Sequence, residues 1–266
     1  MAPRPTVEKN SVYFAVLDAL AKPGCAVCRV MEEASASYLD ALFYEQVSDV
    51  EVRRKLRRAR GLCNWHSWWA SKMTSAALGI SIIAKDLIEE ECTRLAKLEP
   101  RSFWRRLADL IQGRLPRRVT LASLRAWRAR AICPACQIAV EHERHALETV
   151  LNFIDEAQFA RRYEGSTGLC LPHTARAAEL APSHPKLGDF SAIQHGKYAR
   201  LTAELEEFCR KHDYRFTHEA WGAEADAWQR ALETLAGKSG VFGSAIERQQ
   251  AARRSRFLRT LFDRWK

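Results

Sequence analysis

Cys25-Ala-Val-Cys28, followed after 34 intervening residues by Cys63-Asn-Trp-His66, is the stretch around which this chain is organised. The same pattern occurs a second time: Cys133-Pro-Ala-Cys136 is followed after 33 intervening residues by Cys170-Leu-Pro-His173. Each copy supplies three thiols and one imidazole, which make a complete tetrahedral ligand set for zinc. Because four ligand positions recur in the same order, the pattern indicates metal ligands rather than isolated core cysteines.

The duplication extends beyond the ligands. In the same register Gly61-Leu62-Cys63 matches Gly168-Leu169-Cys170, and Asp49 matches Glu156. A unit of this length that occurs twice differs from a solenoid, which stacks shorter units in larger number. The sequence therefore predicts two tandem helical repeats, each closed by its own Cys3His metal site.

Helical periodicity dominates the chain, and strand-like alternation is almost absent, so the sequence predicts an all-α protein. Apolar residues recur at helical spacing from Val27 to about Val47, and a second helix is expected from Val50 to Arg60, before Gly61. The expected organisation has four parts. They are a first helical metal-binding repeat (11–100), a basic helical link (101–130), a second helical metal-binding repeat (131–215) and a C-terminal helical segment with a basic tail (216–266).

Length and composition fit a globular protein. The 266 residues can bury a core in one or two domains, and 47% of them are hydrophobic. No apolar run approaches the roughly 20 residues that a membrane-spanning helix needs, and the N-terminus lacks the apolar core of a signal peptide. The sequence therefore predicts a cytoplasmic protein, in which thiols stay reduced and paired cysteines bind metals more often than they form disulfides.

The predicted cofactor is zinc, two per chain, because three thiolates and one imidazole suit tetrahedral zinc. Two 4Fe–4S clusters, one per repeat, are the alternative, because such a cluster also takes four protein ligands. Cys92 and Cys209 lie at equivalent places in the two copies. They are alternative ligands that could replace or supplement His66 and His173.

Positive charge is concentrated in two segments. The net charge of the chain is +10, of which residues 101–130 carry +8 and residues 248–266 carry +6. Such segments favour a protein partner with an acidic surface, while an anionic membrane or nucleic acid is supported by charge alone. The candidate partner-binding residues are Arg105, Arg106, Arg117, Arg118, Arg253, Arg254, Arg256 and Arg259. The sequence does not indicate an oligomeric state.

The sequence shows no positive sign of a conventional enzyme, because it contains no catalytic triad, phosphate loop or dinucleotide fingerprint. It favours a binding or scaffold protein, with an iron–sulfur protein in electron transfer or cluster delivery as the alternative. A thiol enzyme with Cys133 or Cys136 as nucleophile is a third class. The acidic residues that follow the second Cys-x-x-Cys, among them Glu141 and Glu143, are interpreted as a solvated helix face.

Three stretches after Cys28-Arg29 resemble an uncharacterised family of bacterial proteins. They are Tyr38-Leu39-Asp40, Tyr44-Glu45-Gln46-Val47-Ser48-Asp49 and Gly61-Leu62-Cys63-Asn64-Trp65-His66. Members of that family carry a Cys-x-x-Cys, a Tyr-Glu-x-Val-x-Asp segment and a Gly-Phe/Leu-Cys-x-x-His motif, often with a second, degenerate copy. The resemblance covers roughly residues 20–235 and leaves out the basic end. It implies no activity, since the family has no established function.

Overall fold

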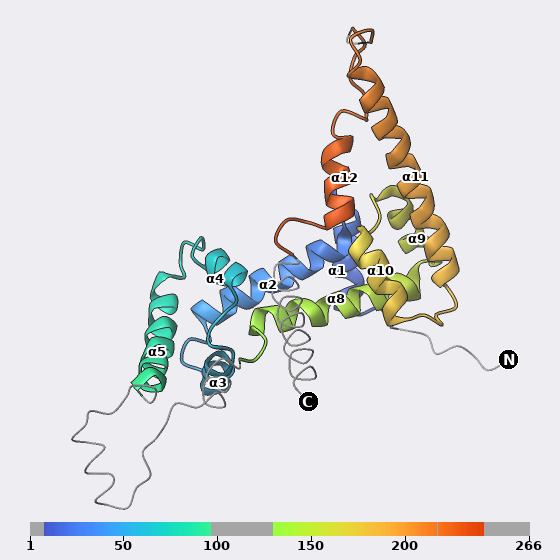
Figure 1. Cartoon of the computed structure of the whole chain (residues 1–266). Coiled ribbons are helices and arrows are strands. Elements are labelled where there is room, and N and C mark those ends of the chain that lie inside the picture. Colours follow the sequence, from blue (N-terminus) through green and yellow to red (C-terminus); the bar gives the residue numbers. More distant parts are fainter. Residues whose placement is uncertain (1–7, 97–129, 217, 242–266) are drawn as a thin grey trace, which may run out of the picture. The chain divides into compact units, whose positions relative to one another are not determined.

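The computed structural model describes residues 8–96, 130–216 and 218–241. Within these ranges the chain is largely helical and contains no β-strand, so the predicted all-α class is confirmed. None of the described helices combines the length and the apolar character that crossing a lipid bilayer requires. In chain order the described helices (Figure 1) are α1 (Ser11–Leu20), α2 (Ala26–Tyr44), α3 (Val50–Ala59), α4 (Asn64–Ala70), α5 (Ala77–Ala96), α8 (Pro134–Phe153), α9 (Ala157–Gly165), α10 (Leu171–Leu180), α11 (Leu187–Lys211) and α12 (Ala227–Ala236).

The chain forms two compact units. One, here called the terminal unit, combines residues 1–36 with 138–266, and the other, the central unit, contains residues 37–137. Each unit therefore draws on both copies of the duplicated sequence. The terminal unit contains the first Cys-x-x-Cys and the second Cys-x-x-His, and the central unit contains the other two motifs.

Two long helices begin in one unit and end in the other. α2 starts directly after Cys25 in the terminal unit and ends at Tyr44 in the central unit. α8 starts directly after Cys133 in the central unit and ends at Phe153 in the terminal unit. With 19 and 20 residues, these helices are about 28 and 30 Å long at a rise of about 1.5 Å per residue.

The core of the terminal unit joins apolar faces of six helices. Its largest fully buried side chains include Tyr13 of α1, Leu147 of α8, Phe159 and Tyr163 of α9, and Phe190 of α11. The N-terminal half of α2 contributes Val27 and Val30 to the same cluster. Burial of these side chains, worth about 1.5–3 kcal/mol each, is the main force that holds the unit together.

The central unit has its own, smaller core. Leu39 and Leu42 of α2 pack with Leu56 of α3 and Ile83 of α5, and the first turn of α8 adds Ala135 to this cluster. α4 also contributes, because Trp69 is partly buried against the cluster and Ala70 belongs to it. Each unit therefore contains a hydrophobic cluster beside one set of cysteines.

The equivalent helices α3 and α9 begin with the same kind of cap. The side chain of Asp49 accepts a hydrogen bond from the backbone N–H of Val52 at 2.8 Å, and that of Glu156 accepts one from Phe159 N–H at 3.0 Å. A carboxylate at this position pairs an N–H that the helix itself leaves unpaired. The two copies thus share local structure where their sequences match.

Part of the predicted organisation lies outside the described residues. The basic link predicted at 101–130 is described only at its last residue, Arg130, and the chain beyond Val241 is not described. All eight candidate partner-binding arginines fall in these ranges: Arg105, Arg106, Arg117, Arg118, Arg253, Arg254, Arg256 and Arg259.

Candidate metal centres

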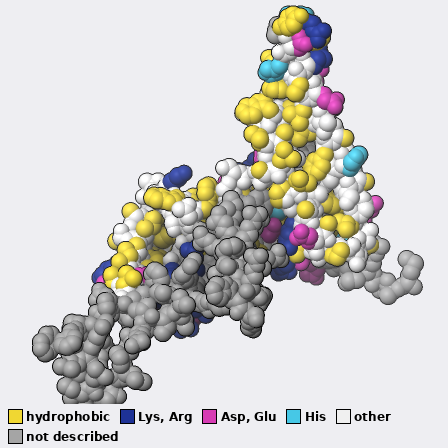
Figure 2. All heavy atoms as spheres, in the orientation of Figure 1, with side chains coloured by type: hydrophobic (Ala, Val, Ile, Leu, Met, Phe, Trp, Pro, Cys, Tyr) yellow, Lys and Arg dark blue, Asp and Glu magenta, His cyan; other side chains and the backbone are white. Residues whose placement is uncertain are grey.

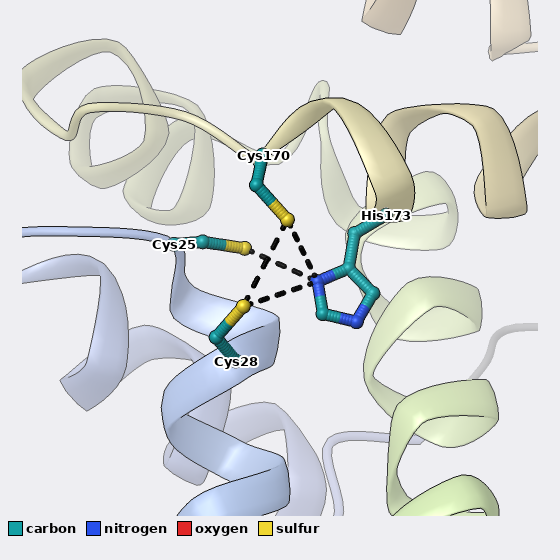
Figure 3. Close-up of side chains that lie close together, drawn as sticks. All are labelled: Cys25, Cys28, Cys170 and His173. Carbon is teal, nitrogen blue, oxygen red and sulfur yellow. Dashed lines mark hydrogen bonds between the residues drawn. The ribbon is translucent and has the colours of Figure 1, made fainter. Parts of the chain in front are cut away.

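The first candidate centre, the terminal group, consists of Cys25, Cys28, Cys170 and His173, all buried. The three thiols converge on Nδ1 of His173 (Figure 3), with Sγ–Nδ1 distances of 3.4, 3.5 and 3.2 Å for Cys25, Cys28 and Cys170. The sulfur atoms of Cys28 and Cys170 lie 3.8 Å apart. The chain thus brings four ligand atoms from two distant segments around one point.

The second candidate centre, the central group, consists of Cys63, His66, Cys133 and Cys136, also buried. Nδ1 of His66 lies 3.2, 3.7 and 3.4 Å from the sulfur atoms of Cys63, Cys133 and Cys136. The sulfur atoms of Cys63 and Cys136 lie 3.6 Å apart. The geometry of the terminal group is therefore reproduced with the other four motif residues.

Both groups fit a single tetrahedral ion. With Zn–S near 2.3 Å and Zn–N near 2.0–2.1 Å, a tetrahedron places two sulfur atoms about 3.8 Å apart and a sulfur and a nitrogen about 3.6 Å apart. The sulfur–sulfur distances here are 3.8 and 3.6 Å. The sulfur–nitrogen distances range from 3.2 to 3.7 Å. All ligand atoms within a group lie within 4.8 Å of one another.

Helix starts position the ligands in both groups. Cys63 and Cys170 are the N-caps of α4 and α10, and His66 and His173 lie in the first turn of those helices. α2 and α8 begin directly after Cys25 and Cys133. The positive end of a helix dipole stabilises thiolates, so two converging helix starts favour ionised cysteines in each group.

Without a cation, the thiols of a group compete for ionisation. Hydrogen bonds from Cys136 and Cys63 lower the pKa of the Cys133 thiol to about 3. The contacts with Cys133 and Cys63 raise the pKa of Cys136 above its ordinary value. Neighbouring like charges cannot all form in a buried site, whereas a bound dication removes this conflict. The donor set is therefore suited to a metal ion.

The predicted pairing of the motifs is wrong. Each Cys-x-x-Cys joins the Cys-x-x-His of the other copy, so neither copy closes its own site. The reason lies in the long helices. α2 carries the chain about 24 Å away from Cys28, and α3, with 10 residues, recovers only about 15 Å of that distance. Cys63 is therefore left in the central unit, where it meets the start of α8.

A buried carboxylate supports the histidine of the terminal group. Nε2 of His173 lies 3.5 Å from Oε1 of Glu143 and 3.2 Å from the sulfur of Met31. Burial alone would lower the pKa of His173, but hydrogen bonds to Cys170, Cys25 and Glu143 outweigh it and raise the pKa to about 11. A carboxylate that accepts from the outer nitrogen of a ligating histidine fixes the orientation of its ring. Glu143 is therefore buried beside the site and not on a solvated face, which corrects the sequence interpretation.

Side chains of α11 hold the loop that presents Cys170. Gln194 accepts a hydrogen bond from Leu169 N–H at 3.2 Å and donates one to the Leu169 carbonyl at 2.9 Å. Lys197 donates to the carbonyls of Glu164 and Ser166 at 3.0 and 2.7 Å. Both side chains are buried. Sequence reasoning missed them because no local pattern shows which helix faces a ligand loop.

Aromatic side chains surround the central group. The ring of Trp69 stacks on His66, with centroids 6.1 Å apart and planes inclined by 17°. Trp65 and Trp68 project from the same short helix and are 37% and 65% exposed. The two centres therefore have identical ligand types but different surroundings.

Cys92 and Cys209, the alternative ligands, belong to neither group. Both are exposed, whereas the eight grouped ligand residues are buried. The structure therefore brings together His66 and His173, and not these two cysteines, with the three thiols of each group.

The part of the chain that contains these ligands matches a known protein family. Residues 9–241 match the model of a family described as a family of unknown function (DUF6062). The chain belongs to this family. The match contains all eight grouped ligands and ends before the basic C-terminal segment. The resemblance to an uncharacterised family is thereby confirmed.

A curated relative extends the comparison. The chain is similar to an uncharacterized 23.9 kDa protein in the xynA 3′ region of Caldicellulosiruptor sp. (strain Rt8B.4). The two sequences are 25% identical over 222 residues, which cover 80% of this chain and 95% of the relative. No solved structure matches the chain.

Proposed function

We propose that this protein is a helical binding module held together by two structural zinc ions, one in each group. The observation that carries the proposal is the convergence of three buried thiols and one imidazole nitrogen at spacings that suit a single tetrahedral ion. All four coordination positions are filled by protein. This supports a structural role over metal catalysis, which needs an open position for substrate or water.

The same spacing favours one ion over an iron–sulfur cluster. In a 4Fe–4S cluster each protein ligand binds a different iron, so the ligand atoms lie much farther apart than they do around one ion. Here the sulfur atoms of Cys63 and Cys136 are 3.6 Å apart, and those of Cys28 and Cys170 are 3.8 Å apart. These distances support zinc, two per chain, over two clusters.

Elemental analysis and an absorption spectrum of protein purified without oxygen test the metal. We expect about two zinc ions per chain and no visible band. Cys63→Ser and Cys170→Ser should each lose one zinc, whereas Cys92→Ser and Cys209→Ser should lose none. About eight iron atoms per chain with an equal amount of sulfide would show two 4Fe–4S clusters and contradict the assignment of zinc. Protein without any metal would overturn the proposal.

The exposed side chains of α3 and α4 are our candidates for contact with an acidic protein partner. α3 exposes Arg54, Lys55 and Arg58, and α4 exposes Trp68. Part of the charge on α3 is balanced by Asp86 of α5, which pairs with Arg53 and Arg57. Exposed tryptophan and arginine residues are both enriched at protein interfaces, where they contribute much of the binding energy.

A photo-reactive residue at position 68 tests this surface. The matched control is position 228 on α12, because Trp228 is also an exposed tryptophan, at 47% against 65% for Trp68. Figure 2 shows hydrophobic side chains gathered over α12 and the adjacent face of α11. We expect acidic proteins to be captured from position 68 only, and less at high salt, which screens charge. Equal capture from both positions would contradict the assignment.

A further inference from the structure

We infer that the two groups hold their ions unequally: the terminal group binds its ion more tightly, whereas the ion of the central group exchanges and thereby regulates the exposed aromatic side chains of α4. The inference rests on the proposed function, because it requires an ion in each group. It comes from the side chains around the ligands, which differ between the groups although the ligand types are the same.

The first difference is the carboxylate beside His173. Glu143 lies 3.5 Å from the outer nitrogen of this ring, and both residues are buried. The register that aligns Cys133 with Cys25 aligns Glu143 with Ser35, which has no carboxylate. In the described part of the chain, the side-chain hydrogen-bond contacts of the His66 ring are those of Nδ1 with the three cysteines of its group. Loss of such an outer partner typically weakens metal binding about 10- to 100-fold, so the terminal group should bind more tightly.

The second difference is the clamp on the ligand loop. In the terminal unit Gln194 and Lys197 hold the backbone before Cys170 with hydrogen bonds at 2.7 to 3.2 Å. The register that aligns Gly196 with Gly79 places Ala77 and Ile80 at the equivalent positions. These side chains cannot hydrogen-bond the loop before Cys63. A ligand on a less restrained loop leaves the metal more readily, which again favours exchange at the central group.

Solvent exposure of the ligands also favours exchange at the central group. In the central group His66 is 4% exposed and Cys133 is 8% exposed, whereas in the terminal group Cys25 is 4% exposed and His173 is fully buried. A competing ligand must reach the metal before it can remove it. The central group is therefore the slightly more accessible of the two.

Loss of the central ion should change the exposed aromatic surface of α4. α4 has only seven residues, and an isolated helix of this length is not stable in water. Its N-cap and first turn carry two of the four ligands, Cys63 and His66, so the ion anchors the helix at its start. Without the ion, Trp65 and Trp68 lose the backbone that presents them, and the partner surface is lost with it.

Differential alkylation tests the order of release. Zinc-loaded full-length protein is first treated with iodoacetamide to block the exposed Cys92 and Cys209. One equivalent of a zinc chelator is then added with fresh reagent, and labelled cysteines are located by mass spectrometry. We expect Cys63, Cys133 and Cys136 to react at least about tenfold faster than Cys25, Cys28 and Cys170, in proportion to the difference in metal affinity. Equal labelling of the two sets, or the reverse order, would overturn the inference.

Two variants test whether Glu143 causes the difference in labelling rate between the two groups. Glu143→Gln should speed labelling of the terminal cysteines about 10- to 100-fold without changing the central ones. Ser35→Ala, at the equivalent position, should change neither. The emission of Trp68, obtained as the difference between the parent protein and Trp68→Phe, should change in wavelength or intensity with the first equivalent of chelator. Protein that carries no zinc before the chelator is added would overturn the proposed function itself. The order of labelling in the unmodified protein decides the inference, even where a variant does not fold.

Discussion

At the residue scale, Gly61 and Gly168 have the same backbone conformation but lie beside different side chains. Both precede a ligand cysteine and adopt left-handed backbone, with φ of +88° and +84°. A side chain in this region costs roughly 1–2 kcal/mol. A Cβ on Gly61 would lie 3.3 Å from Leu87, whereas one on Gly168 would overlap Oε1 of Gln194, a buried side chain that clamps the loop.

We therefore expect both glycine-to-alanine substitutions to destabilise the protein, and Gly168→Ala to cost at least about 1 kcal/mol more than Gly61→Ala because it also overpacks the site. Urea unfolding of the zinc-loaded variants measures the difference. Equal losses would mean that Gln194 moves aside freely and does not hold the loop.

Glu156 gives a prediction for acid pH. Its carboxylate accepts hydrogen bonds from Phe159 N–H and from the hydroxyl of buried Tyr13, both at 3.0 Å. The backbone bond from Phe159, together with that from Tyr13, lowers its pKa below the ordinary value of 4.5. Because the folded-state pKa is the lower one, this stabilisation is present above pH 4.5 and is lost as the pH falls through the folded-state value.

Glu156→Gln should therefore lower the free energy of unfolding at pH 7 by roughly 0.3–1 kcal/mol, the usual contribution of a carboxylate charge at a helix N-terminus, and the gap to the parent protein should close in acid. Urea unfolding between pH 7 and pH 3 checks this. Asp49→Asn is the matched control, since Asp49 caps α3 in the same way. A gap that stays constant with pH would show that the carboxylate charge does not contribute.

At the scale of helices, the sequence was informative about local features. Cys-x-x-Cys, Cys-x-x-His and the caps at Asp49 and Glu156 are short patterns, and their local geometry follows from a few neighbouring residues. The pairing of the motifs is a long-range property. The expected lengths of the helices at 27–47 and 50–60 were the signal that a within-copy site would be separated, because the first helix is about twice as long as the second.

Paired substitutions distinguish the two ways of joining the motifs. Cys28→Ser should remove one zinc, and adding Cys170→Ser should remove no more, because both ligands belong to one group. Adding Cys63→Ser to Cys28→Ser should remove both ions. Zinc content per chain is the measurement. Pairing within each copy would give the opposite result for the two double variants.

At the scale of the whole molecule, the two groups make nested cross-links in the chain. Cys28 and Cys170 are 142 residues apart, and the segment between them contains Cys63 and Cys136, which are 73 residues apart. Once the central group is closed, the loop that the terminal group must close shortens to about half of its length. Halving a flexible loop lowers the entropic cost of closing it by about 0.6 kcal/mol.

The loop-closure value of about 0.6 kcal/mol limits the coupling free energy that chain connectivity alone can provide between the two ions. Urea unfolding of the parent protein, Cys63→Ser, Cys170→Ser and the double variant forms a double-mutant cycle, and we expect a coupling energy of about 0.6 kcal/mol, close to the usual error of such cycles. Each group lies in its own unit beside its own hydrophobic cluster, so most of each ion's stabilisation should be local. A coupling energy of several kcal/mol would contradict this expectation, because chain connectivity cannot supply so much. α2 and α8 begin in one unit and end in the other, so such a value would identify them as the route by which loss of one ion destabilises both units.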